Sequence, residues 1–338
     1  MCSFLKKISF TVLIIFCTAF AVYPQSLEQL QNGVAALSED LAKSLPFNAS
    51  IGLNWSDAYI GKLIPSAPPH FGIGISAGLT TMKMSGLDKV ASLLGFTMPD
   101  IPLVKNKMVL PAYAAEARIG GFFLPFDIGV KFGILPPIPL PGSLKMNYTL
   151  FGADFRWALM EGNVVLPKIS IGLGVNYLKG GIGMKVGSGS QFTFNYNSTP
   201  YTLAISQPEV NLLWDTFAVE AKVQFSKSFL IITPYAGFGA GYSWSKAGYE
   251  IKTAATLNTN PIGQAQKDII QNYLNGAGLA GIDFTGNGFS SIVKMSGFNV
   301  RFFGGLSLNL AVVRLDFTFM YNILDKQIGA TFGFRVQL

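Results

Sequence analysis

The sequence predicts an all-β fold, a transmembrane antiparallel β-barrel of about twelve strands (range of roughly 10–14) preceded by an amphipathic helix. Three observations support this prediction. Segments that alternate apolar and polar residues recur along the chain, a charged and then apolar leader opens it, and no later span of about twenty apolar residues could form a membrane helix. An exported chain that is 50% hydrophobic, contains 37 glycines and lacks a membrane helix has the composition of a transmembrane barrel.

The leader has the three parts of a secretory signal peptide. Two lysines precede a run of apolar residues, and Ala19-Phe20-Ala21 offers small residues at a cleavage site. We therefore predict a signal peptide over residues 1–21, with cleavage as late as residue 25 as the alternative. Both cysteines, Cys2 and Cys17, lie in this peptide, so the mature chain is expected to have no disulfide.

The charge pattern bears on the partners. Loss of Lys6 and Lys7 with the leader leaves 23 basic and 18 acidic residues, a net charge of +5. No run of Lys or Arg is present that could follow a phosphate backbone, so nucleic acid is not an expected partner. Outer-membrane lipids are the expected surroundings of a chain with this composition.

Residues 26–45 have the periodicity of an amphipathic helix. Apolar residues recur at intervals of three and four, while most charged residues fall between them. Two interpretations remain open: a helix that packs at the mouth of the barrel, and a plug in the lumen that moves to admit a solute. The apolar character favours the first, because helices inside a lumen are usually more polar.

Strand alternation then dominates residues 46–338, which form the predicted barrel. Eleven segments alternate: 47–55, 71–79, 113–119, 126–134, 148–157, 168–177, 217–225, 232–244, 298–308, 315–321 and 328–338. Single-chain bacterial barrels have an even number of strands, so we expect a twelfth within 81–111 or 180–208.

The links between these segments differ in length. Long loops are expected at 180–208, with a projecting hairpin, and at 246–294. Short helices are expected near 87–94 and 265–274. The proline-rich run 135–141 is expected to be a turn, because proline cannot donate to a central strand.

The last segment, 328–338, places Phe332 and Phe334 on its apolar face and Arg335 on its polar face. Such terminal strands resemble the sorting signal of bacterial outer-membrane barrels, although most of those end in Phe or Trp and this chain ends in Leu338. The resemblance implies recognition of the C-terminal strand by the barrel-assembly machinery and location in the bacterial outer membrane.

Most of residues 30–178 resemble an uncharacterised family of bacterial outer-membrane barrels with an N-terminal helix. The matching features are that helix, the stretch Gly52-Leu53-Asn54-Trp55, the proline-rich segment before residue 112, the run 124–133 and the Leu166-Pro167 strand entry. The resemblance implies fold and compartment and brings no established substrate.

Charged residues on the polar faces of the strands are the candidate lumen-facing set: Glu116, Arg118, Asp127, Lys131, Asp154, Arg156, Lys168, Glu220, Lys222, Arg301, Asp316 and Arg335. The two signs are nearly balanced, whereas a wide ion-selective pore would carry an excess of one sign. We interpret most of these residues as mutually neutralising. A further hypothesis places Arg301 and Arg335 at a constriction for an anionic or amphiphilic solute.

Catalytic, cofactor and metal sites are not expected. The single histidine, His70, follows two prolines and has no nucleophile motif near it. The mature chain has no cysteine, and no calcium loop is present.

Two functions follow from this pattern. The first is a narrow or gated channel for small molecules, since a barrel of this size lies between side-chain-filled barrels and open porins. The apolar proline-rich segments, 98–102 and 135–141, favour a hydrophobic solute. The alternative is a non-conducting surface barrel whose long loops act in adhesion or partner binding.

Overall fold

The computed structural model describes residues 24–83, 103–104, 107–140, 144–185, 190–196, 199–207, 209–252, 255–257, 260–261, 263–264, 283–284 and 288–338. The predicted signal peptide and the short helices expected near 87–94 and 265–274 lie outside these residues. Within the described part of the chain, no helix is long and apolar enough to cross a membrane.

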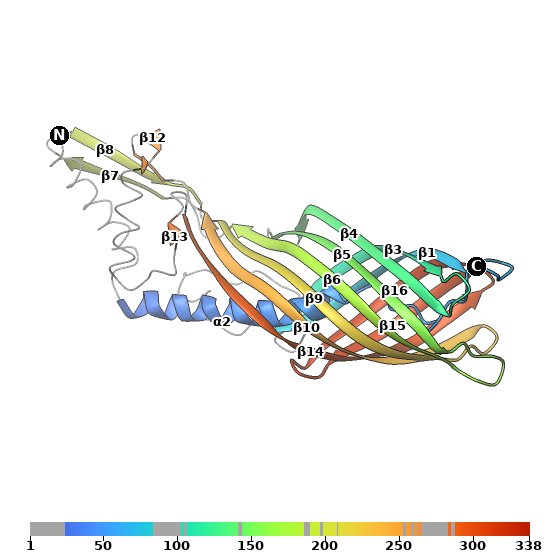
Figure 1. Cartoon of the computed structure of the whole chain (residues 1–338). Helices are drawn as coiled ribbons and strands as arrows, with labels where there is room; N and C mark the ends of the chain where they lie inside the picture. Colours follow the sequence, from blue (N-terminus) through green and yellow to red (C-terminus); the bar gives the residue numbers. More distant parts are fainter. Residues whose placement is uncertain are drawn as a thin grey trace.

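Among the described residues, 10 long strands form a closed antiparallel barrel (Figure 1). Sequential strands pair with their neighbours, and β1 closes the barrel by pairing with β16 on one edge and β3 on the other. The strands are β1 Phe71–Lys83, β3 Lys107–Gly120, β4 Phe126–Leu140, β5 Leu144–Met160, β6 Lys168–Lys185, β9 Glu209–Ser226, β10 Ile232–Lys252, β14 Gly288–Leu310, β15 Val313–Asn322 and β16 Gln327–Gln337.

The two ends of the barrel differ. One end, the turn end, carries the C-terminus and the links 121–125, 161–167, 227–231 and 311–312. The opposite end, the loop end, carries the connections from β1 to β3, β6 to β9 and β10 to β14 (Figure 1). The Leu338 amide donates to the Phe71 carbonyl oxygen at 3.0 Å, so the terminal strand meets the first strand at the turn end.

The expected number of about twelve strands is wrong, and the reason is the segment 47–55. Ten of the eleven alternating segments are barrel strands, whereas 47–55 contains the end of helix α2 Pro24–Ala49 and the irregular chain after it. The even-number rule therefore required the removal of one segment rather than the addition of another. In this segment residues of both parities are buried, so its alternation does not separate an inner face from an outer one.

The connections also differ from the sequence prediction in detail. The proline-rich run 135–141 is not a turn: β4 continues to pair with β5 through Leu140, and a register shift between Leu135 and Ile138 accommodates the prolines. The irregular stretches are shorter than 180–208 and 246–294, because β6, β10 and β14 extend into them.

Small strands occupy these shortened stretches. The expected hairpin is confirmed as β7 Ser190–Tyr196 and β8 Thr199–Ile205, which joins β11 Ala255–Leu257 and β12 Asn260–Pro261 in a second sheet. Two further short strands, β2 Leu103–Val104 and β13 Asp283–Phe284, pair with β3 and β14.

The outer face of the barrel is apolar. Side chains on this face alternate with buried ones along each strand, as the period of two requires. Exposed large apolar residues are found around the circumference, among them Ile73, Ile75, Phe132, Phe151, Leu173, Phe217, Phe238, Phe302, Phe317, Phe332 and Phe334.

Candidate functional site

The interior of the barrel is occupied by the chain's own N-terminal part. Helix α2 enters from the loop end (Figure 1), and residues 50–60, the lumen segment, continue through the barrel toward the turn end. Every residue of the lumen segment is buried, and Gly61, which follows it, is the first partly exposed position. Of the two interpretations of the helix, occupation of the lumen is therefore the one that matches its position.

The lumen segment has no regular secondary structure, so its backbone polar groups need partners from the strands. Strand side chains supply them. The Ile60 amide donates to Asp127 Oδ2 at 3.1 Å, and the Ala58 amide donates to Ser226 Oγ at 2.9 Å. Strand side chains also donate to the segment's carbonyl oxygens: Gln224 to Trp55, Arg156 to Asp57 and Lys168 to Tyr59.

Lys131 holds the junction between the helix and the lumen segment. Its buried ammonium group donates to the carbonyl oxygens of Ala49 at 2.7 Å and Ile51 at 2.6 Å. A helix leaves its last carbonyl groups without intrahelical partners, and a cation there also interacts favourably with the helix dipole. The chain then turns at Gly52, where φ is +87° and a Cβ atom would lie 3.0 Å from Glu116 and Lys131 side-chain atoms.

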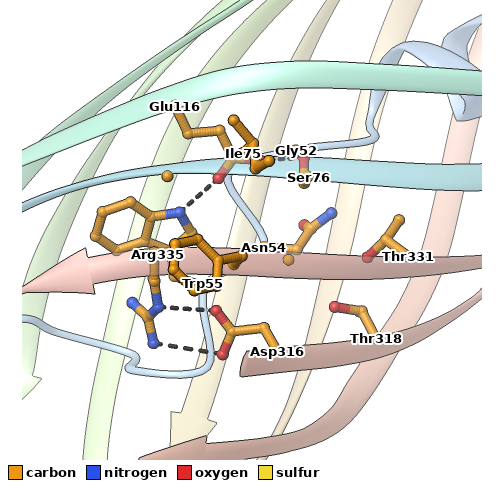
Figure 2. Close-up of a pocket in the computed structure, with 13 residues that line it drawn as sticks. Gly52, Asn54, Trp55, Ile75, Ser76, Glu116, Asp316, Thr318, Thr331 and Arg335 are labelled. Atoms are coloured by element: carbon orange, nitrogen blue, oxygen red, sulfur yellow. Dashed lines mark hydrogen bonds and ion pairs between the residues drawn. The ribbon is translucent and has the colours of Figure 1, made fainter. Parts of the chain in front are cut away.

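The side chain of Trp55 contacts charged residues from two strands of the barrel, β3 and β16. The guanidinium carbons of Arg335 and Arg118 lie 4.5 and 5.5 Å from its ring centroid. Its indole nitrogen donates to Glu116 Oε2 at 2.5 Å, a contact drawn in Figure 2. Ser76 donates to the other oxygen of Glu116. The indole is thus bound by two cations on its faces and by a carboxylate at its edge.

The turn-side half of the lumen contains a network of buried ion pairs. Arg118 donates to Asp127 at 2.5 Å and to Asp154 at 2.7 Å, and Arg156 binds the same Asp127 at 2.8 Å. Further ion pairs join Arg301 to Glu220 at 2.6 Å, Lys222 to Asp154, and Arg335 to Asp316 at 2.8 Å. Unpaired charges would be costly in the interior of a barrel, and here each charged group has a partner of opposite sign.

All twelve predicted lumen residues contact a partner in this network or the lumen segment, and Lys168, which binds Asp57 and Tyr59, is partly exposed at the turn-side rim. Arg301 and Arg335 do not face an open constriction. Both are paired with carboxylates, and both also bind the lumen segment, through Asn54 and Asp57.

Sequence analysis missed the lumen segment's own contribution to the site. Asp57 adds a sixth carboxylate to the five predicted, and Asn54 and Trp55 complete the network. Asn54 and Trp55 fall in the predicted strand 47–55, whose alternation indicated an inner and an outer face, and Asp57 lies just beyond it. Ser56 and Asp57 carried the available signal. Both are polar and follow the predicted strand, and a carboxylate that is buried outside the strands needs a cation as its partner.

The loop-side half of the interior is apolar. Leu37, Leu41 and Leu45 of α2 are buried against side chains from at least six strands. These side chains include Met82, Met108, Leu110, Met146, Tyr148, Leu178, Ile182, Leu212, Trp214, Tyr249 and Met320. An apolar helix is stable here because this half of the lumen is a hydrophobic core, contrary to the expectation that a lumen helix must be polar.

Little empty space remains beside Trp55. A cavity of about 20 Å³ is lined by Asn54, Trp55, Ser76, Glu116 and Arg335, among others (Figure 2). This volume holds about one water molecule. The conformation described here therefore has no room for a solute beside this part of the lumen segment.

The arrangement of the titratable residues in the described part of the chain bears on metal binding. In that part of the chain, no group of three or more His, Cys, Asp or Glu residues could hold a metal ion. The His70 ring lies at the turn end, where Nδ1 is 3.1 Å from the Leu338 carbonyl oxygen.

Comparison with family models and with curated proteins gives no match. Among solved structures, the chain is similar to Ail, the attachment invasion locus protein of Yersinia pestis (10% identity, 79% of this chain, 95% of that chain, TM-score 0.26). It is also similar to the outer membrane protease OmpT from Escherichia coli (9% identity, 80% and 95% coverage, TM-score 0.38). A third match is the CymD monoaromatic hydrocarbon channel (8% identity, 79% and 87% coverage, TM-score 0.22). These identities and TM-scores carry no argument about activity, and the class of the protein, a closed ten-stranded barrel filled by its own N-terminal part, follows from the strand pairing.

Proposed function

We propose that this protein is a bacterial outer-membrane barrel that passes small hydrophobic molecules when its N-terminal plug, α2 and the lumen segment together, moves. Location in a membrane is supported by the apolar outer face, which would be costly to expose to water over the whole circumference. The predicted signal peptide supports export to that membrane. Short turns face the periplasm in such barrels, so the loop end would face outward.

The turn end adds support for a position at the membrane interface on the periplasmic side. Its links expose large apolar side chains, with Leu230 at 99% and Val164 at 95%. The backbone beneath them is internally satisfied, because Lys227 donates to the carbonyl oxygens of residues 163, 164 and 166 and the Asn163 side chain accepts from two amides. Backbone groups must be satisfied in this way wherever a chain enters an apolar phase.

The observation that carries the transport proposal is the apolar loop-side half of the lumen. If α2 withdraws, the surface it leaves is lined by methionine and aliphatic side chains, which adapt to apolar ligands of different shapes. Such a chamber suits a hydrophobic solute better than an ion. The charged turn-side half would remain closed to ions as long as its pairs persist.

A disulfide lock tests the gating. The Ala58 amide donates to Ser226 Oγ at 2.9 Å, and this contact between the lumen segment and β9 makes Ala58→Cys and Ser226→Cys the pair to test for a bridge. The mature chain has no other cysteine if the leader is removed as predicted. We expect uptake of a labelled aromatic hydrocarbon by intact cells to fall on oxidation and to recover on reduction. Each single-cysteine variant serves as the control, and equal uptake by the locked and reduced forms would contradict gating by the lumen segment.

The alternative is a non-conducting barrel that anchors elements at its loop end. The observation in its favour is the extensive fixation of the lumen segment by buried ion pairs and hydrogen bonds. This alternative expects equal hydrocarbon uptake by cells with and without the protein. It also expects planar bilayers containing the reduced cysteine pair to show no conductance steps.

A further inference from the structure

The outward face of the barrel carries a row of charges at the loop end. In strand register, Lys179 of β6 lies opposite Asp215 of β9, which lies opposite Lys246 of β10, which lies opposite Lys294 of β14. The three lysines are exposed. Four neighbouring strands thus present three cations and one anion at a single level of the barrel.

The contact between Lys246 and Lys294 is unfavourable as it stands. Residues directly opposite on one face of an antiparallel pair have Cβ atoms about 4.5–5.5 Å apart, and like charges there are destabilising. Among the described residues neither lysine has an ion pair or hydrogen bond, and Asp215 accepts a hydrogen bond from the Tyr177 hydroxyl at 3.1 Å. An anion held between the two ammonium groups would relieve this repulsion.

Aromatic side chains lie directly beneath this row, toward the turn end. Phe217 and Trp244 stack with ring centroids 6.0 Å apart, and Tyr242 packs against Trp244 at 5.0 Å and Phe298 at 5.1 Å. Tyr and Trp are enriched at the level of lipid headgroups in membrane proteins. The apolar outer face continues without interruption below these rings, where acyl chains would lie.

The lysines at the turn end are arranged differently. Lys62 pairs with Glu161 at 2.9 Å, Lys168 donates to the Tyr59 carbonyl oxygen at 2.9 Å, and Lys227 donates to the Val164 carbonyl oxygen at 2.6 Å. These cations have partners within the protein. Lys246 and Lys294 differ from these lysines, because both are exposed and available to a ligand.

From this juxtaposition we propose that Lys246 and Lys294, assisted by Lys179, bind the phosphate of a lipid headgroup whose acyl chains lie on the aromatic and aliphatic surface below. The proposal rests on the membrane location in the proposed function and is independent of gating. The occupant is a lipid rather than a free phosphate because the charged row is continuous with the apolar face.

Lipid binding by the full mature protein, folded in neutral maltoside micelles, tests the proposal. The probes are dioleoyl phosphatidic acid, dioleoyl phosphatidylcholine and inorganic phosphate, with bound lipid counted by native mass spectrometry and stability followed as Tm. The variant K246Q/K294Q is compared with K43Q/K62Q, which removes the same charge at Lys43 on α2 and Lys62 at the turn end.

We expect phosphatidic acid to bind the wild type and K43Q/K62Q equally, and K246Q/K294Q about tenfold or more weakly, given the usual contribution of a lysine near an anionic surface. Binding should weaken with added salt.

Equal affinity of both double variants, or equal affinity for phosphatidylcholine, would overturn the proposal. Equal binding of inorganic phosphate would overturn the choice of a lipid. If K246Q/K294Q does not fold, K294Q and the salt dependence of the wild type decide. Because no conductance is measured, failure here leaves the gating proposal intact, whereas failure of the protein to fold in any membrane or micelle would contradict the proposed function itself.

Discussion

Replacement of Trp55 by alanine is the sharpest test of how the lumen segment is held. Trp55 is 3% exposed, and the guanidinium carbons of Arg335 and Arg118 lie 4.5 and 5.5 Å from its ring centroid. Truncation of a buried tryptophan to alanine costs about 3–5 kcal/mol, and loss of the cation–π contacts adds about 1–2 kcal/mol for desolvated pairs. The hydrogen bond to Glu116 is lost as well, which leaves that carboxylate with Ser76 as its remaining donor among the described contacts.

This cost falls on the seated segment alone. In an unseated segment Trp55 would be exposed to water, so its truncation would cost little there. A loss of about 4 kcal/mol therefore raises the ratio of unseated to seated molecules about a thousandfold, since each 1.4 kcal/mol is a factor of ten.

Single-channel recording in planar bilayers measures the consequence. We expect W55A to open for a larger fraction of time than the wild type, and the oxidised Ala58→Cys/Ser226→Cys pair to suppress these openings. Trp157→Ala is the matched control, because Trp157 packs against Phe126 and Phe155 on the outer face and does not touch the lumen segment. A folded W55A barrel with the same open fraction as W157A would refute the reasoning.

Three further predictions follow from the same contacts. Lys131→Met removes the donor to two carbonyl oxygens at the end of α2. This change should weaken the binding of the lumen segment by about 2–3 kcal/mol and accelerate hydrogen exchange of the amides of residues 50–54. Unchanged exchange would show that Lys131 does not hold the segment. Asp127→Asn removes the carboxylate shared by Arg118 and Arg156. The free energy of unfolding in urea should fall by about 3–5 kcal/mol. A decrease below about 1 kcal/mol would show that the ion pairs of the network are not coupled. An epitope inserted after residue 25, in the first turn of α2, should be labelled by antibody on intact cells, because α2 leaves the barrel at the loop end (Figure 1). Labelling only after permeabilisation would contradict the assigned orientation.

The strands and the inner or outer position of their side chains could be predicted from the sequence. A residue on a strand points to one of two faces, and the apolar outer face fixes which parity is which. Arg335 between Phe334 and Val336 is an example: its neighbours are exposed at 41% and 39%, while Arg335 itself is 1% exposed. The same rule placed Asp127 and Arg156 inside the barrel.

The partners of those inner residues could not be predicted in this way. Alternation says that Arg118 points inward, but its pairing with Asp154 depends on barrel closure, strand register and what else fills the lumen. The hypothesis of an arginine constriction gave Arg301 and Arg335 a solute as their partner. In the structure Arg301 binds Glu220 and Asn54, and Arg335 binds Asp316 and Asp57, so carboxylates of the chain itself hold both guanidinium groups.

Residues 47–55 mark the boundary between what the sequence determines and what only the tertiary structure decides. Their alternation is real, but Phe47 packs into an apolar core while Asn48 bonds to Thr80 and Leu110 of the surrounding strands. In a segment enclosed on all sides, apolar residues pack against apolar neighbours and polar residues form hydrogen bonds to other neighbours. Its sequence can therefore alternate like that of a strand with one polar and one apolar face. The sequence pattern alone predicts a barrel with an apolar exterior and a charged interior. The closure of ten strands around α2 and the lumen segment decided that this interior is full, because only contacts between distant parts of the chain distinguish a strand in the wall from a segment inside it.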